Sequence, residues 1–523
     1  MKVLPKKYLF LGLILILTSL MFFKNAWVTE DAYINFRSVE QVIAGNGPIW
    51  NPHERVQVFT SPLWFWLLIM VRLVSENLFL VTIFLSYVLW LLTLFVFYRL
   101  ARSHKVFFIG FILLISSNAF FDYTSSGLEN IMGYFLITLF ISSFLKLFDD
   151  EKAPQLAQRI LDQKKLTIIS LIIFGLIICV RHDLLLLVLP AAVYIVWQNK
   201  KLFSLKKWLV IIPVVLLPFA LWSLFSTLYY GFPFPNTAYA KLGTQISRTQ
   251  LINQGFIYFY STITNDLITL LLISISIIYS LISPKKPILV INAGILLNFL
   301  YILSIGGDFM RGRFFSYAFL ITALLMAIQI GAGSGKIIRY AVILSVILYS
   351  LFYPHTPLNS PIDYSNEQRP HGIADERGYF FRYLSFNKYV IAQFRNEQFP
   401  QYFLCEEGKK APNLSISQNV GLYGYCAGLD KIIIDPLAIT DPFLARIPVT
   451  GSWRIGHFYR EIPEGYIESV AHDQPLIKDP QLNELYEDIT LITKSEKLFS
   501  TDRLRTIVKM NLGRDVLMTE NNY

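Results

Sequence analysis

The feature that most constrains this sequence is a series of apolar runs, most of them close to the length that crosses a bilayer. Such a crossing needs roughly 20 apolar helical residues. Charged residues make up 16% of the chain, whereas soluble domains carry about 25%. The composition therefore predicts a multi-pass membrane protein and excludes a soluble enzyme or a disordered chain. Eleven runs are predicted to span, at about 8–23, 78–98, 106–117, 128–147, 166–180, 183–197, 208–229, 266–282, 288–305, 314–331 and 337–353.

The distribution of charge predicts how these runs cross the membrane. Residues 1–353 carry 28 basic and 14 acidic side chains, and residues 354–523 carry 18 basic and 22 acidic ones. A basic half that is also the apolar half indicates topology signals rather than nucleic-acid binding. With eleven crossings, nineteen lysines and arginines fall on one side, which the positive-inside rule assigns to the cytoplasm. We therefore expect a cytoplasmic (inner) membrane protein whose C-terminal domain lies outside, in the periplasm.

One further apolar segment, 61–74 (SPLWFWLLIMVRLV), is long enough to be considered as a span. Counting it as a crossing would move the next basic cluster outside and invert the rest of the topology. We predict instead a juxtamembrane amphipathic helix at the outer interface, with Trp64 and Trp66 at headgroup level.

The chain is predicted to have two domains. Residues 1–353 form a transmembrane domain, and a proline-containing stretch that follows Phe352 is interpreted as the linker into a soluble domain, 354–523. Strand-like runs such as 431–434 and helix-like runs such as 386–398 predict α/β content there. Cys405 and Cys426 both lie outside, where a disulfide bridge is plausible.

Polar residues gather in five loops that all emerge on the predicted outer face. Ionisable residues at the ends of spans are costly unless they pair or line a wet cavity, so they are functional candidates. The alternative is that they are ordinary interfacial anchors and ion pairs. The candidates are Glu30, Asp31, Arg37, His53 and Arg55 in the first loop, Glu129 in the second, Arg181, His182 and Asp183 in the third, Asn236 and Lys241 in the fourth, and Asp308, Arg311 and Arg313 in the fifth.

Asp31 has the strongest individual case, because it directly follows the first span beside a second carboxylate. Partial burial would raise the pKa of this carboxyl group toward that of a useful general base. Arg311 and Arg313 flank a glycine, which lets backbone and guanidinium approach a phosphate closely. His182 beside Asp183 could be a metal ligand or a proton shuttle, although a structural hydrogen bond is the commoner role. No other pattern has metal-ligand spacing.

Several of these segments resemble one family. The segments EDAYINFR…GNGPIWNPHERVQVFTSPLW, SSGLEN at 125–130, PFPNTAYAKL at 233–242 and GGDFMRGRFF at 306–315 are similar to the GT-C superfamily of polytopic glycosyltransferases. Residues 419–469 look like the outer domain of the terminal arabinofuranosyltransferases of mycobacterial and corynebacterial cell walls.

The resemblance implies a mainly α-helical membrane fold of the GT-C type, with an extracytoplasmic α/β domain. It implies an inverting glycosyltransferase that moves a sugar, D-arabinofuranose, from a polyprenyl-phosphate donor to a cell-envelope glycan, with Asp31 as general base. Arg311, Arg313, Lys241 and Arg181 would stabilise the donor phosphate. No cofactor is predicted; a divalent metal is conceivable, but a second ligand set is missing. No nucleic-acid partner is expected.

Two alternatives stay open. The chain could be a GT-C mannosyl or hexosyl transferase that acts on a surface protein or a lipopolysaccharide. It could also be a transporter or flippase of lipid-linked sugars, although such proteins need polar residues at the bilayer midplane and often inverted repeats.

In the outer domain, a segment with aromatic and cationic side chains could stack on and hydrogen-bond a sugar acceptor. The alternative is an ordinary domain edge. The candidates are Trp453, Arg454, His457, Tyr459 and Arg460.

Overall fold

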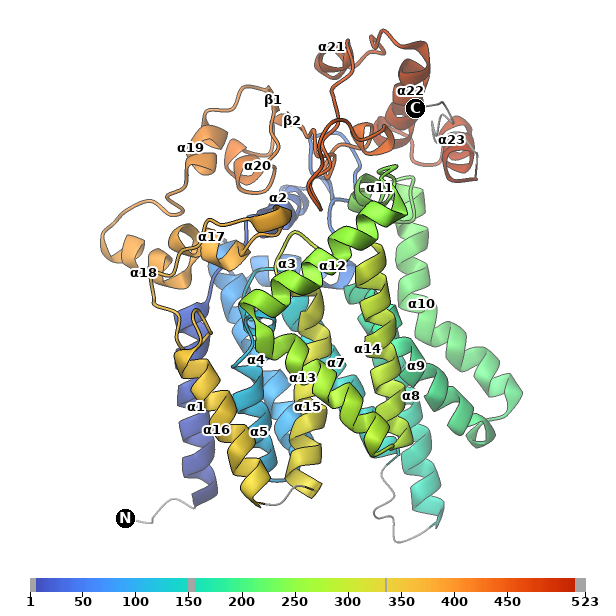
Figure 1. Ribbon diagram of the computed structural model, residues 1–523. Coiled ribbons are helices and arrows are strands. Elements are labelled where there is room, and N and C mark those ends of the chain that lie inside the picture. Colours follow the sequence, from blue (N-terminus) through green and yellow to red (C-terminus); the bar gives the residue numbers. More distant parts are fainter. Residues whose placement is uncertain (1–5, 149–155, 334–335, 513–523) are drawn as a thin grey trace. The chain divides into compact units, whose positions relative to one another are not determined.

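The computed structural model describes residues 6–148, 156–333 and 336–512, and in these ranges the protein is mainly helical (Figure 1). The chain divides into two compact units, each assembled from three segments. Unit 1 comprises Met1–Thr29, Ser75–Val215 and Gln254–Pro400; unit 2 comprises Glu30–Val74, Leu216–Asn253 and Gln401–Tyr523. Helices α10 (Leu205–Tyr229) and α12 (Arg248–Asn265) contribute to both units.

Unit 1 is a bundle of long apolar helices that pack closely. In Figure 1, α9 and α14 run side by side. A Cβ atom at Gly294 of α14 would lie 2.0 Å from the carbonyl oxygen of Leu187 in α9, so a small residue is required for this approach. The unit contains α1 (Lys6–Asn25), α4 (Leu78–Ala101), α5 (His104–Leu114), α6 (Asn118–Phe121), η1 (Asp122–Thr124), α7 (Asn130–Leu147), α8 (Leu156–Val180), α9 (Leu184–Gln198), η2 (Lys200–Leu202), α13 (Leu267–Ile282), α14 (Lys286–Ser304), η3 (Arg313–Phe315), α15 (Ser316–Gly333), α16 (Lys336–Phe352), η4 (Pro370–Gly372), α17 (Glu376–Leu384) and α18 (Phe386–Phe394).

Every predicted span overlaps one of the helices, which supports a multi-pass membrane protein. Within the described residues, six helices are long and apolar enough to cross a bilayer, or eight if each of two bent helix pairs counts as one span. One bent pair joins α12 to α13 at 107°, and α12 is absent from the predicted runs because polar residues interrupt it. The number of eleven crossings therefore stays a prediction.

Unit 2 consists of shorter helices and one small parallel sheet. Strand β1 pairs with β2 in register Leu414↔Ile432 to Ile416↔Ile434, which confirms the strand predicted at 431–434. The sequence predicts an α/β domain, and among the described residues this two-stranded sheet is its only β-sheet. The elements are α2 (Ala32–Ile43), α3 (Pro62–Arg72), α11 (Asn236–Leu242), α19 (Phe403–Lys409), β1 (Leu414–Ile416), α20 (Leu422–Ala427), β2 (Ile432–Ile434), η5 (Leu444–Arg446), α21 (Tyr466–His472), α22 (Pro480–Lys494) and α23 (Thr501–Leu512).

The two units do not follow the predicted division at 353/354. Residues 354–400 belong to unit 1, where backbone bridges pair Met310 with Ala374 and Trp27 with Ser385. The prolines after Phe352 suggest a linker, but the chain beyond them returns to the bundle and hydrogen-bonds to it. The helix predicted at 386–398 is α18, and it too lies in unit 1.

Helix α3 has the length and the two faces expected of an interfacial helix. Its eleven residues extend about 16 Å at 1.5 Å per residue, too short for a hydrocarbon core of roughly 30 Å. Trp66 and Met70 are 41% and 58% exposed, respectively, but Trp64 is fully buried. Trp64 is therefore a buried residue, and the predicted headgroup position can apply to Trp66 alone.

Candidate functional site

Five of the predicted candidates form one ionic cluster in unit 1: Glu129, Arg181, Asp183, Asp308 and Arg313. Arg181 donates through Nε and Nη2 to both oxygens of Asp183 at 2.9 Å and through Nη1 to Glu129 Oε1 at 3.1 Å. Arg313 reaches the same Glu129 oxygen at 3.5 Å and Asp308 Oδ2 at 3.6 Å. The cluster thus joins residues from three separate parts of the sequence.

The loop that carries Asp308, Arg311 and Arg313 is shaped by its glycines. Gly312 has φ +72°, and a Cβ atom there would lie 2.7 Å from the Cβ of Ala119. The loop is also hydrogen-bonded to the segment that follows α16, because Arg311 N–H donates to the carbonyl oxygen of Ala374 at 2.9 Å. This pairing sets Arg311 Nη1 3.5 Å from Asp375 Oδ2.

Burial and ion pairing together determine the pKa values of the neighbouring residues Arg181, His182 and Asp183. Burial alone would lower the pKa of Arg181, but Asp183 and Glu129 outweigh it and hold that pKa well above its ordinary value. Burial would raise the pKa of Asp183, yet Arg181 holds it below the ordinary value. Burial also lowers the pKa of His182, which favours the neutral imidazole. Arg181 and Asp183 therefore stay charged at neutral pH.

Two guanidinium groups of the 308–313 loop each have a buried N–H group without an acceptor among the described residues. The Nε atoms of Arg311 and Arg313 are buried and have no hydrogen-bond partner in the part of the chain that the structure describes. A buried donor without a partner costs about 1–3 kcal/mol. Both groups would gain from an anionic acceptor.

Asp31 lies in unit 2, at the start of α2, next to Glu30, whose carboxyl group is buried. Glu30 is 8% exposed and accepts a hydrogen bond from Leu422 N–H at 2.7 Å. Burial, together with the charges of Asp31 and Asp435, raises the pKa of Glu30 to about 8. Asp31 is partly exposed, whereas Glu30 is buried.

Three other candidates hold the backbone of unit 2 together. Arg37 is fully buried and donates to the carbonyl oxygens of Trp50, Gly424 and Lys431. Asn236 Nδ2 donates to the carbonyl oxygens of residues 438, 439 and 441. Arg460 is also fully buried and donates to four backbone carbonyls. These contacts give the three residues a structural role in unit 2. Asn236 also lines a cavity there, and the cavity roles of Arg37 and Asn236 and the acceptor contact of Arg460 stay predictions.

The remaining candidates of unit 2 lie nearer its surface. His53 is exposed, Lys241 is partly buried, and Arg55 donates through Nη2 to the carbonyl oxygen of Ser495 at 2.5 Å. In the predicted acceptor segment, Tyr459 is exposed, whereas Trp453, Arg454 and His457 are partly buried in a turn closed by the bridge between residues 454 and 457.

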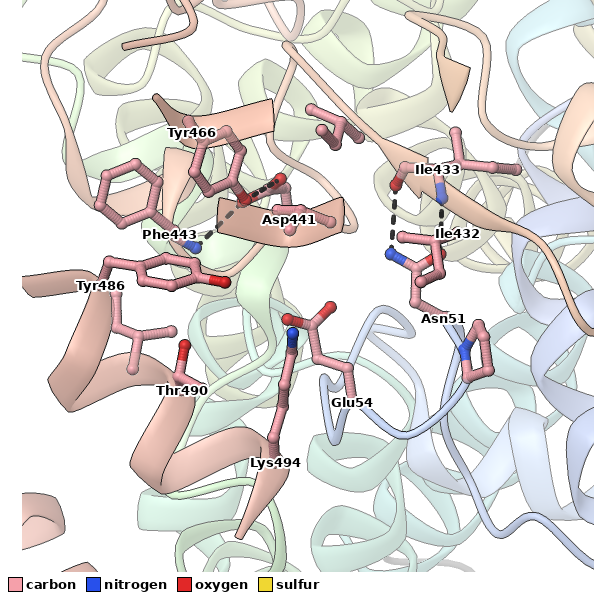
Figure 2. Close-up of a pocket in the computed structure, with 14 residues that line it drawn as sticks. Asn51, Glu54, Ile432, Ile433, Asp441, Phe443, Tyr466, Tyr486, Thr490 and Lys494 are labelled. Atoms are coloured by element: carbon pink, nitrogen blue, oxygen red, sulfur yellow. Dashed lines mark hydrogen bonds between the residues drawn. The ribbon is translucent and has the colours of Figure 1, made fainter. Parts of the chain in front are cut away.

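Some residues with site-like environments are not detectable from the sequence pattern. In unit 1, Asp375 faces Arg311, and Arg377 pairs with Asp122 at 3.7 Å, but the prolines before this segment suggest a separate domain. In unit 2, Glu54, Asp441 and Lys494 line a cavity (Figure 2). They come from three distant parts of the sequence, and no local pattern groups them. No set of three or more His, Cys, Asp or Glu side chains in the described ranges has the geometry to hold a metal ion.

The structure thus defines a class, a polytopic helical membrane protein with a buried ionic cluster in its bundle. No known family model matches the chain. Curated relatives match it locally: the terminal β-(1→2)-arabinofuranosyltransferase of Corynebacterium glutamicum is 42% identical over 50 residues, and that of Mycobacterium tuberculosis is 42% identical over 45 residues. These matches cover 10% and 9% of this chain but only 7% of each relative. The resemblance to terminal arabinofuranosyltransferases is confirmed over these short segments.

Solved structures show a partial likeness over most of the chain. The oligosaccharyltransferase of Archaeoglobus fulgidus in the apo form is 14% identical with a TM-score of 0.46, and the match covers 84% of this chain and 65% of that one. ArnT from Cupriavidus metallidurans in the apo state is 13% identical with a TM-score of 0.45, over 84% of this chain and 78% of that one. Scores at this level, below 0.5, establish no functional equivalence.

Proposed function

We propose that this protein is an inverting glycosyltransferase that uses a polyprenyl-phosphate sugar as donor. The observation that carries the proposal is the arginine loop of unit 1. Arg311 and Arg313 lie on one glycine-shaped loop next to apolar helices, and each has a buried Nε–H without an acceptor among the described residues. Phosphate oxygens match guanidinium donors in both charge and geometry.

The ionic cluster supplies the support that such a loop needs. Glu129 contacts both Arg181 and Arg313, so the two guanidinium groups are held in place before any substrate binds. Preorganised donors of this kind stabilise charge that develops on a leaving group. In the proposed reaction, the bond between the anomeric carbon and the phosphate oxygen breaks, and the lipid phosphate leaves with the electron pair.

Asp31 is the proposed general base. It would take the proton of the acceptor hydroxyl as that oxygen attacks the anomeric carbon from the face opposite the phosphate. The partial exposure of Asp31 beside the buried Glu30 supports this choice, since a base must be reachable by the acceptor. The local identity to terminal arabinofuranosyltransferases supports arabinofuranose, proposed as the D-sugar, as the group transferred. The charge pattern, which predicts the polar loops on the outer face of the cytoplasmic membrane, supports an acceptor on that side, and the proposed acceptor is a cell-envelope glycan.

Transfer by the purified, reconstituted protein tests this proposal. The donors are synthetic polyprenyl-phosphate arabinofuranose and its mannose analogue, each offered with an oligo-arabinofuranoside acceptor. We expect a new glycosidic bond with the furanose donor only. Asp31→Asn should lower the rate by about 10²–10⁴, and Arg313→Gln by about 10²–10³.

The controls are Asp502→Asn and Arg395→Gln, which neutralise exposed side chains outside the ionic cluster and outside the segment around Asp31. A folded Asp31→Asn protein with full transfer activity would refute the role of Asp31. Movement of lipid-linked sugar across proteoliposomes without any new glycosidic bond would favour a transporter instead.

A further inference from the structure

The backbone on both sides of Arg311 is held by hydrogen bonds within unit 1. Ala374 N–H donates to the carbonyl oxygen of Phe309 at 2.7 Å, and Arg311 N–H donates to the carbonyl oxygen of Ala374 at 2.9 Å. The hydroxyl group of Tyr123 donates to the carbonyl oxygen of Arg311 at 3.1 Å. Because these bonds fix the backbone, the direction of the Arg311 guanidinium group depends on what its side chain contacts.

Asp375, in the segment that follows α16, is the carboxylate that this guanidinium group faces. Arg311 Nη1 lies 3.5 Å from Asp375 Oδ2, and the two side chains are only 13% and 11% exposed. At such burial the attraction between opposite charges is several times stronger than in water, but 3.5 Å is long for a hydrogen bond. The carboxylate therefore orients the guanidinium group and leaves it able to bind a further anion.

Asp375 is itself fixed by three donors outside the arginine loop. Its Oδ1 accepts from Gly378 N–H at 2.8 Å and so caps α17. Its Oδ2 accepts from the hydroxyl group of Tyr364 and from Asn366 Nδ2, the latter at 3.3 Å. Since these donors satisfy the carboxylate, it keeps its position and its hydrogen bonds when the guanidinium group of Arg311 binds an anion.

We propose that Asp375 is a positioning residue for Arg311, so that the segment 364–378 completes the donor-phosphate site. This inference rests on the proposed glycosyltransferase function. The carboxylate sets the direction of the guanidinium group before the donor binds, and less binding free energy is then spent on ordering a flexible side chain. Asp375 itself contacts neither the donor nor the reacting atoms and acts through Arg311.

Donor kinetics of the full-length, reconstituted protein test the inference. Asp375→Asn removes the charge that faces Arg311 but keeps the cap of α17, because asparagine caps a helix as well as aspartate does. We expect the KM for polyprenyl-phosphate arabinofuranose to rise about tenfold, within the range of coupling between residues in contact, with the acceptor KM unchanged. Asp479→Asn, the same change at the cap of α22, is the matched control and should leave both KM values unchanged.

A second variant keeps every charge in place. Tyr364→Phe removes one hydrogen bond to Asp375, so the carboxylate is held less firmly. The donor KM should rise, but by less than in Asp375→Asn. If Asp375→Asn does not fold, as judged by thermal unfolding, this variant decides the inference, and an unchanged donor KM in Tyr364→Phe refutes it.

A double-mutant cycle separates positioning from a merely structural role. In an Arg311→Gln background, Asp375→Asn should change the donor KM by less than about twofold, because no guanidinium group remains to be oriented. A loss of the same size in both backgrounds would show that Asp375 only stabilises the fold, and would refute the inference.

Binding of polyprenyl phosphate without a sugar, measured by calorimetry in detergent, distinguishes this inference from the function beneath it. If the wild type transfers sugar and Asp375→Asn leaves the donor KM unchanged or lower, the inference is refuted and the proposed function stands. If polyprenyl phosphate binds about tenfold more weakly to Asp375→Asn than to the wild type but no sugar is transferred, the proposed function fails and the positioning role stands. If the wild type neither binds polyprenyl phosphate nor transfers sugar, both are refuted.

Discussion

Gly312 shows how a single residue shapes the arginine loop. Its φ of +72° strains any residue with a Cβ, and the added atom would lie 2.7 Å from Ala119. We expect Gly312→Ala to destabilise the protein by about 1–3 kcal/mol and to weaken donor binding, because Arg311 and Arg313 would shift together. Thermal unfolding of the purified protein measures the first effect, and the donor KM measures the second.

Gly45 provides the matched control, since its φ is +85° but no atom lies within 4 Å of the position that an added Cβ would occupy. Gly45→Ala therefore carries the backbone strain without the steric contact. Equal loss of stability in the two variants would show that the contact with Ala119 is unimportant.

At the residue scale, sequence reasoning identifies charges but not their burial. It selects Glu129, Arg181, Asp308 and Arg313 because they stand at the ends of apolar runs, and the structure brings them together. It also selects Arg37 and Arg460, whose guanidinium groups donate to backbone carbonyls. The sequence shows which residues carry a charge. Tertiary packing determines whether a charged side chain lies where it can contact a ligand or instead donates hydrogen bonds to backbone carbonyl groups.

At the scale of elements, the disulfide between Cys405 and Cys426 joins α19 to α20 across 21 positions of sequence. This confirms the bridge that two cysteines on the predicted outer side made plausible. Closing a loop of this length stabilises the folded state by about 3 kcal/mol in the chain-entropy model. The double substitution Cys405→Ser/Cys426→Ser should lower the free energy of unfolding of unit 2 by that amount.

Chemical denaturation with and without reductant measures this effect. Reductant should destabilise the wild type and leave the double variant unchanged. A wild type whose unfolding is insensitive to reductant, with the bridge shown by mass spectrometry to be reduced, would contradict the prediction.

A helix can be predicted from the sequence when one local property, such as a continuous apolar run, is sufficient to define it. A helix whose position depends on contacts with distant segments is harder to predict. The apolar runs of 78–98 and 208–229 are α4 and α10, because a continuous run of apolar residues suffices. Helix α17 and the bridge of Ala374 to Met310 lie outside the sequence predictions. Their place in unit 1 depends on backbone pairing with a loop about 60 residues away, and the sequence carries no local mark of that pairing.

At the scale of the whole molecule, unit 2 contains several buried carboxyl groups whose pKa values are raised. Burial raises the pKa of Glu30 from 4.5 to about 8, and that of Glu54 and Asp435 to about 7. Between pH 4.5 and 8 the folded state therefore holds protons that the unfolded state has released, so stability falls as pH rises through this window. We expect thermal unfolding of the protein at a lower temperature at pH 8 than at pH 5.

Glu30→Gln isolates one contribution, because the amide is neutral at every pH. The variant should show a shallower decline of stability between pH 5 and pH 8 than the wild type. A stability that instead increases with pH over this range in the wild type would show that these carboxyl groups are ionised in the folded protein.

The charge pattern predicts on which side of the membrane each segment lies, and accessibility of single cysteines tests it. Ser452 is exposed in the predicted outer domain, and Ser283 is exposed beside a predicted inner lysine pair. Because Cys405 and Cys426 are bridged and Cys179 is buried, an introduced cysteine is the expected site of reaction. In intact spheroplasts, a membrane-impermeant maleimide should label Ser452→Cys and leave Ser283→Cys unlabelled until the membrane is opened. Labelling of both before opening, or of Ser283→Cys alone, would contradict the predicted topology and remove the reason for expecting an acceptor outside the cell membrane.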